Sequence, residues 1–181
     1  ELSAVGQRRT DARREYQEAH SADSYVNRNS SDRCIVGLNA GPPITPLAYN
    51  QNMQLFQTPD HVAFLHEENH EIRIIPLDGR QHVSRGIRLW RGDSRGHWDG
   101  DTLVIETTNY SSQARFRGAS DNLHMVERLT RVGPRTLDYE VTITDPTTWT
   151  RPWTVMIPLM GSDDAIFEYA CHEGNIGMEG I

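Results

Sequence analysis

The sequence predicts an all-β fold: an antiparallel meander of about eight strands that forms a barrel or a curved sandwich, with one N-terminal helix. Three observations predict it. From about residue 52, short runs rich in β-branched and aromatic residues follow one another, turn residues separate these runs, and no helical pattern lies between them. Strands joined directly by turns pair antiparallel, whereas parallel strands need longer crossover connections.

The first 50 residues predict a helix and an extended arm. Residues 3–19 are rich in Ala, Arg, Glu and Gln, which favour a helix, and their polarity predicts a surface or docking helix. A polar connector at 20–33 and a proline-rich stretch follow. We then expect strands at 53–58, 62–65, 72–75, 87–90, 101–107, 123–131, 136–144, 153–159 and 165–171, with a glycine-rich loop at 91–100 and a polar loop at 109–118.

Length and charge limit the domain number and the partners. The 181 residues suit one structural unit, with the helix and arm at 1–50 and the β-barrel-like domain at 51–181. A net charge of -7 disfavours nucleic acid as a partner. No run approaches the roughly 20 apolar residues of a membrane span. A small-molecule ligand or substrate is the expected partner, and the oligomeric state is open.

The two cysteines, Cys34 and Cys171, are too few and too far apart for a zinc ribbon or a redox pair. They form either a disulfide between the arm and the last strand or two separate buried thiols. The disulfide is favoured, because closing so long a loop contributes about 4 to 5 kcal/mol in the chain-entropy account. A disulfide implies an oxidising compartment, so we expect a secreted or periplasmic protein.

Residues 66–70 match the H-E-x-x-H string of zinc proteases, which binds zinc only on a helix. Strand-like runs flank them, so we expect a hairpin instead. With a three-residue loop, His66 pairs across from His70, on the same face as Phe64 and Ile72, and a slip of one residue separates them.

Two interpretations of this histidine pair stay open. The histidines are either exposed side chains at the hairpin tip or ligands and catalytic groups at a cavity mouth. A metal held by His66 and His70 needs a third ligand, for which the candidates are His82, His124 and His172.

Glu127 breaks the alternation of its strand, where Leu123, Met125 and Leu129 mark an inner face. A buried carboxylate costs several kcal/mol unless it is paired or protonated. Glu127 therefore forms a salt bridge to an internal arginine, or the strand faces are reversed, or Glu127 is a general acid or base in a cavity.

Four strings carry a resemblance to a known family: RIIPLDGR, GDSRGHWDGDTLVIETTNY, DPTTWTRPWTV and EYACHEGN, which begin at residues 73, 92, 145 and 168. Together they resemble a family of secreted bacterial proteins without an established activity, over most of the chain from about Asp32. The resemblance implies export and an all-β core. It supplies no catalytic residue, and it favours His70 over His66, which falls at a variable position.

The leading functional hypothesis is an exported enzyme doing acid-base chemistry, as a lyase, isomerase or hydrolase, on a small organic or sugar-derived molecule. Glu127 and His70 form its acid-base pair, with Tyr139 and His172 as orienting or proton-donating neighbours. No cofactor is expected, since phosphate-loop and dinucleotide fingerprints are missing. One alternative is a non-catalytic module binding a small molecule or a protein, with Glu127 neutralised by an arginine. Another is a metalloprotein holding a divalent transition metal.

Overall fold

The computed structural model describes residues 1–21, 23–37, 41–46, 49–113 and 116–176. Parts of the expected arm and of the polar loop after residue 109 lie outside these ranges. The helical elements are α1 (Ala4–His20) and the short 3-10 turns η1 (Tyr25–Asn27), η2 (Glu68–His70) and η3 (Phe116–Gly118). The strands are β1 (Met53–Gln57), β2 (His61–His66), β3 (Ile72–Pro76), β4 (Asp93–Asp99), β5 (Thr102–Thr108), β6 (His124–Gly133), β7 (Thr136–Thr144) and β8 (Trp153–Met160).

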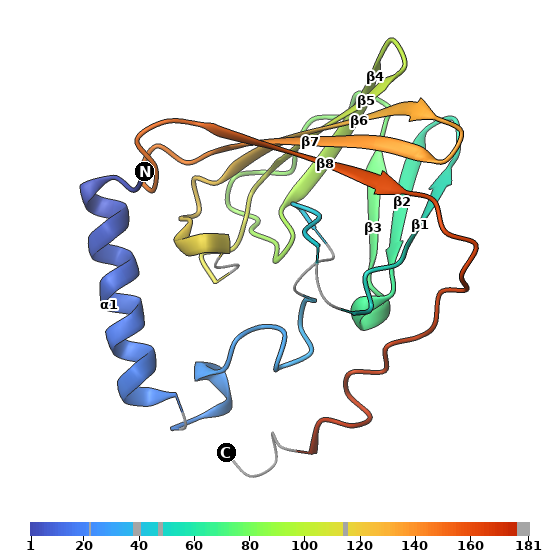
Figure 1. Ribbon diagram of the computed structural model, residues 1–181. Helices are drawn as coiled ribbons and strands as arrows, with labels where there is room; N and C mark the ends of the chain where they lie inside the picture. Colours follow the sequence, from blue (N-terminus) through green and yellow to red (C-terminus); the bar gives the residue numbers. More distant parts are fainter. Residues whose placement is uncertain (22, 38–40, 47–48, 114–115, 177–181) are drawn as a thin grey trace.

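The strands form two antiparallel sheets, one with the order β1-β2-β3 and one with the order β4-β5-β6-β7-β8 (Figure 1). Within each sheet every strand pairs with its neighbour in sequence, which confirms the predicted meander. No pairing within the described residues closes the sheets into a barrel. The curved sandwich, with its N-terminal helix, is therefore the observed architecture.

The core lies between the two sheets and takes alternate residues from each strand. Phe64 on β2 and Ile75 on β3 belong to the same buried cluster as Ile105, Met125 and Tyr139 of the larger sheet. Each of these five side chains is at most 1% exposed. Burying each one contributes roughly 2 kcal/mol, so the cluster is what holds the sheets together.

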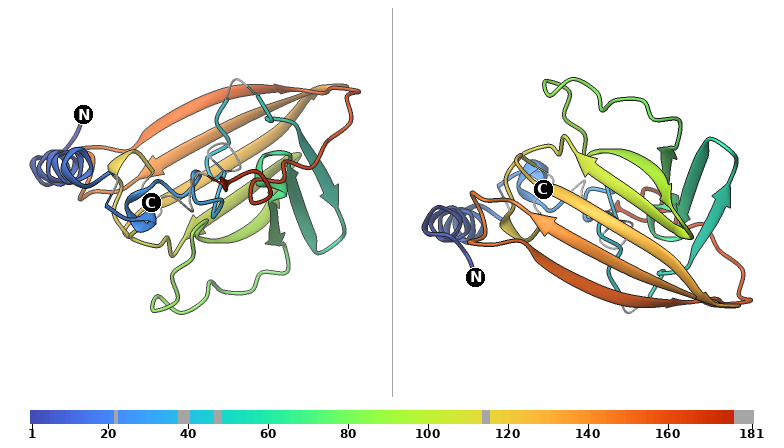
Figure 2. Two further views of the ribbon diagram at one scale, coloured as in Figure 1. Left: turned by 90° about the horizontal axis from the view of Figure 1, so that it is seen from below. Right: turned by 90° about the horizontal axis from the view of Figure 1, so that it is seen from above.

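The sheets converge where β3 and β4 lie side by side, as both views in Figure 2 show. Gly96 permits this approach, because a Cβ there would lie 2.7 Å from Leu77 Cδ2 and 3.0 Å from Ile75 Cγ2. The prediction of a glycine-rich loop at 91–100 is wrong, because most of this range forms strand β4. Its glycine serves close packing within a strand rather than a turn.

Two of the predicted strands, at 87–90 and 165–171, are wrong as well. Residues 87–90 contribute only an isolated parallel bridge, between Leu89 and Tyr110. Residues 165–171 contain no strand, and residues 161–176 pair with neither sheet. An apolar pattern shows that a run can be a strand, but pairing also needs a sheet edge beside it.

Cys34 and Cys171 form a disulfide, with their Cα atoms 5.7 Å apart. It joins the arm to the extended segment after β8 rather than to a last strand. In the described part of the chain, no helix has the length and apolar character needed to cross a membrane. Export itself stays a prediction.

Candidate functional site

The β2–β3 hairpin differs by one residue from the expected register. Phe64 pairs with Arg73 rather than with Ile72, and His66 N donates to the carbonyl of Glu71 at 2.8 Å. The connection takes four residues instead of three, with His70 in the left-handed region at φ 49°. The expected pairing of His66 with His70 is therefore wrong.

This shift decides which histidine lies inside. His66 is 4% exposed and His70 is exposed at the hairpin tip. Arg73, not Ile72, shares the inner face with Phe64. His66 therefore lies inside and His70 outside, whereas the resemblance favours His70, and the functional role of His70 stays a prediction.

His66 is an uncharged imidazole at neutral pH. Burial, followed by the nearby positive charges of Arg91 and Arg73, lowers the pKa of His66 to about 3. The ring stacks on Phe64, with the centroids 6.4 Å apart. A neutral imidazole offers one hydrogen-bond donor and one acceptor, and no charge.

Glu127 pairs with an internal arginine, as one of the open interpretations proposed. Arg73 Nη1 donates to Glu127 Oε1 at 3.0 Å, and Arg73 Nη2 donates to Oε2 at 2.5 Å. Arg73 also donates to the hydroxyls of Ser94 and Thr107, each at 3.0 Å. Because Glu127 is 0% exposed, the pair and its two hydroxyl partners form a buried polar network between the sheets.

Tyr139 completes this network. Its hydroxyl donates to Glu127 Oε1 at 2.8 Å and accepts from the backbone N–H of Ile44 at 3.0 Å. Burial, and then the Glu127 carboxylate, raises the pKa of Tyr139 well above its usual value. Burial acts to lower the pKa of Arg73, but the effect of the Glu127 carboxylate is larger. The pKa of Arg73 is therefore raised above its usual value. Tyr139 therefore stays protonated and Arg73 stays cationic.

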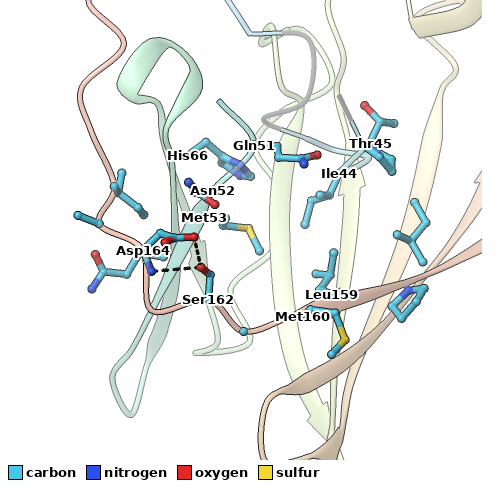
Figure 3. A pocket seen from close by; sticks show the side chains of 17 residues that line it. Ile44, Thr45, Gln51, Asn52, Met53, His66, Leu159, Met160, Ser162 and Asp164 are labelled. Atoms are coloured by element: carbon cyan, nitrogen blue, oxygen red, sulfur yellow. Dashed lines mark hydrogen bonds between the residues drawn. The ribbon is translucent and has the colours of Figure 1, made fainter. Parts of the chain in front are cut away.

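A pocket of about 710 Å³ lies beside this network, between the edge strands β1 and β8. Figure 3 shows Asn52, Met53 and His66 on one wall, with Leu159 and Met160 opposite. We call it the inter-sheet pocket. Its lining residues are Ile44, Thr45, Pro46, Gln51, Asn52, Met53, Gln54, His66, Ile157, Pro158, Leu159, Met160, Gly161, Ser162, Asp164, Ala165 and Ile166.

The structure brings Glu127 and Tyr139 together but leaves the two other predicted catalytic residues apart. His70 is exposed at the hairpin tip, and His172 is exposed in the turn after Cys171. Neither has a contact with Glu127 among the described residues. The catalytic roles of all four residues stay predictions.

The possible third metal ligands lie elsewhere. His82 and His124 line another cleft, of about 690 Å³, where His82 bonds Asp93 at 2.9 Å and His124 bonds Glu106 at 2.7 Å. Across the described ranges, no three His, Cys, Asp or Glu side chains gather as a metal site. The metalloprotein alternative stays a prediction.

Three residues of the site are absent from the sequence-based predictions: Arg73 in the buried network, and Gln51 and Asn52 in the pocket. A signal for Arg73 existed, since a charged residue in the run from Ile72 to Ile75 matches the misfit carboxylate of Glu127. For Gln51 and Asn52 the sequence carries no signal, because they precede a strand in an ordinary polar stretch.

Comparisons with known proteins add no assignment. No protein-family model matches the chain, and neither a curated protein nor a solved structure matches it.

Proposed function

We propose that the protein binds a small, uncharged, amphipathic organic molecule in the inter-sheet pocket. The observation that carries this proposal is the character of the lining. Of its 17 residues, Asp164 is the one acidic residue and none is a lysine or arginine, and His66 is uncharged at neutral pH. Pockets of about 300 to 1,000 Å³ with apolar walls and a few polar groups are typical of small-molecule sites.

The two walls differ in polarity. On the β1 and β2 side, Gln51, Asn52 and His66 present hydrogen-bonding groups, whereas Leu159 and Met160 on the β8 side are apolar. A molecule with a polar edge and an apolar body matches both walls. A strongly charged molecule does not, because the pocket offers it no counter-charge besides Asp164.

The buried network supports binding more than acid-base chemistry. Glu127 already accepts two hydrogen bonds from Arg73 and one from Tyr139, and it is 0% exposed. A general base must reach a substrate proton through a free acceptor position. A neutralised Glu127 is the property expected of the non-catalytic alternative.

The test fills the pocket and measures the affinity for Nile red, an uncharged amphipathic dye, by fluorescence titration. Leu159→Trp places an indole in the pocket, and we expect the dissociation constant to rise at least 10-fold. Met156→Trp is the matched control, because Met156 lies on the same strand but is 60% exposed and outside the lining. Equal dye affinity in both variants and the wild type would contradict the proposal.

A further inference from the structure

The segment from residue 161 to 176, which follows β8, forms one side of the inter-sheet pocket. We call it the strap. Gly161, Ser162, Asp164, Ala165 and Ile166 line the pocket, and residues 161–170 contain neither helix nor strand. In Figure 1 the strap leaves β8 and descends beside the smaller sheet. It therefore crosses the opening between the edges of the two sheets.

The start of the strap is clamped by Arg135, in the turn between β6 and β7. Arg135 donates to both carboxylate oxygens of Asp163, at 2.9 and 3.0 Å, and to the carbonyl of Gly161 at 2.9 Å. The amide of Gly161 donates back to the Arg135 carbonyl at 2.7 Å. This end belongs to the larger sheet and stays with it.

The middle of the strap is held weakly. Between Asp164 and Ala170, within the described residues, one hydrogen bond reaches outside the strap, from the Phe167 amide to Glu67 Oε1 at 3.3 Å. Most side chains here are exposed, and Phe167 is 69% exposed. Apolar burial therefore contributes little to holding the strap over the pocket.

The far end of the strap is held by the disulfide. Cys171 is bonded to Cys34, which is 8% exposed. Asn175 Nδ2 adds hydrogen bonds to the carbonyl of Asp32 at 2.7 Å and to Cys34 Sγ at 3.2 Å. Folding exchanges such hydrogen bonds for hydrogen bonds to water, so each adds little, and the covalent bond dominates this attachment.

We propose that the strap is a cover for the inter-sheet pocket and that the Cys34–Cys171 disulfide is its latch, so that a dithiol reductant opens the pocket. The inference rests on the proposed function, since it names the control of the same site. The two thiols of the reductant lose two electrons and two protons and close into a disulfide of their own. The S–S bond of the protein breaks, and Cys34 and Cys171 each gain one electron and one proton.

The first arm of the test measures backbone motion by NMR relaxation of the full chain, before and after reduction with dithiothreitol. We expect order parameters at residues 164–176 to fall below about 0.6 while those of β4–β8 stay near 0.85. The Cys34→Ser, Cys171→Ser double variant should reproduce the reduced form. Glu168→Gln is the matched control, because it changes an exposed strap side chain away from the latch.

The second arm measures access by stopped-flow mixing with Nile red. We expect reduction to raise the association rate constant at least fivefold. Strap order parameters that do not change on reduction overturn the latch, whatever the dye does. A strap that loosens while Nile red binds neither form leaves the latch standing and overturns the proposed function. Equal association rates despite a loosened strap overturn the role of the strap as a cover.

Discussion

At the scale of single residues, the buried pair of Arg73 and Glu127 explains the clearest anomaly of the sequence. Glu127 could be recognised from its strand pattern alone, because a carboxylate stands where a core residue is expected. Arg73 also stands out, as a charge in the run from Ile72 to Ile75, but the pattern does not show that it points inward, since the hairpin register depends on one additional residue in the connection. A local pattern identifies the misfit, and only the tertiary structure supplies its neutralising charge.

Removing one partner of this pair should be costly. Glu127→Gln leaves the buried Arg73 guanidinium without a counter-charge, and we expect the free energy of unfolding in urea to fall by about 3 to 5 kcal/mol. Replacing both, as Arg73→Met with Glu127→Leu, should recover most of that loss. Glu140→Gln on the neighbouring strand serves as the control and should change stability by less than about 0.5 kcal/mol. A double variant less stable than Glu127→Gln contradicts this account.

At the scale of elements, helix α1 shows what composition can and cannot predict. Its helix-favouring residues predict the element to within a residue at each end, and Ser3 caps it by accepting from the amide of Gly6 at 2.9 Å. Its docking is not encoded in that composition. Gly6 is the one buried residue of the helix, and it lies against the backbone of Thr148.

Gly6→Ala should therefore destabilise the protein although alanine favours helices. A Cβ at Gly6 would lie 2.3 Å from the carbonyl oxygen of Thr148. Relieving this contact requires a shift of the backbone, which costs more than a change of side-chain rotamer. Overpacking costs about 1 to 3 kcal/mol, which exceeds the gain of up to about 1 kcal/mol in helix propensity. Gly86→Ala is the control, because its nearest contact would be 3.9 Å away. A thermal denaturation midpoint raised by Gly6→Ala would contradict the docking geometry.

At the scale of the whole molecule, the sequence predicts the class and the meander but not how the sheets are divided. At the break, Gly96 of β4 packs against Ile75 of β3 and against Leu77, which follows β3, and β3 and β4 are not paired by hydrogen bonds. The inter-sheet pocket lies at the opposite edges of the two sheets, between β1 and β8, which do not pair with each other. Its lining comes from distant segments, so no local motif predicts it.

The stability of the whole fold should depend on pH through His66. The ordinary pKa of 6.5 falls to about 3 in the folded protein. Below pH 6.5 the unfolded chain therefore binds a proton that the folded chain does not, and stability decreases as the pH falls. The loss should reach about 3 kcal/mol between pH 6.5 and 4. Urea unfolding at several pH values measures it, and His66→Leu should flatten the curve. Parallel curves for the two proteins would contradict a buried neutral His66.

The disulfide has a topological consequence. Cys34 and Cys171 are 137 residues apart, and all the strands in the described residues, from Met53 to Met160, lie between them. The whole β structure is thus enclosed in a covalent ring. A single backbone cut inside that ring, as at the exposed turn of Arg85 and Gly86, leaves one linked molecule rather than two fragments.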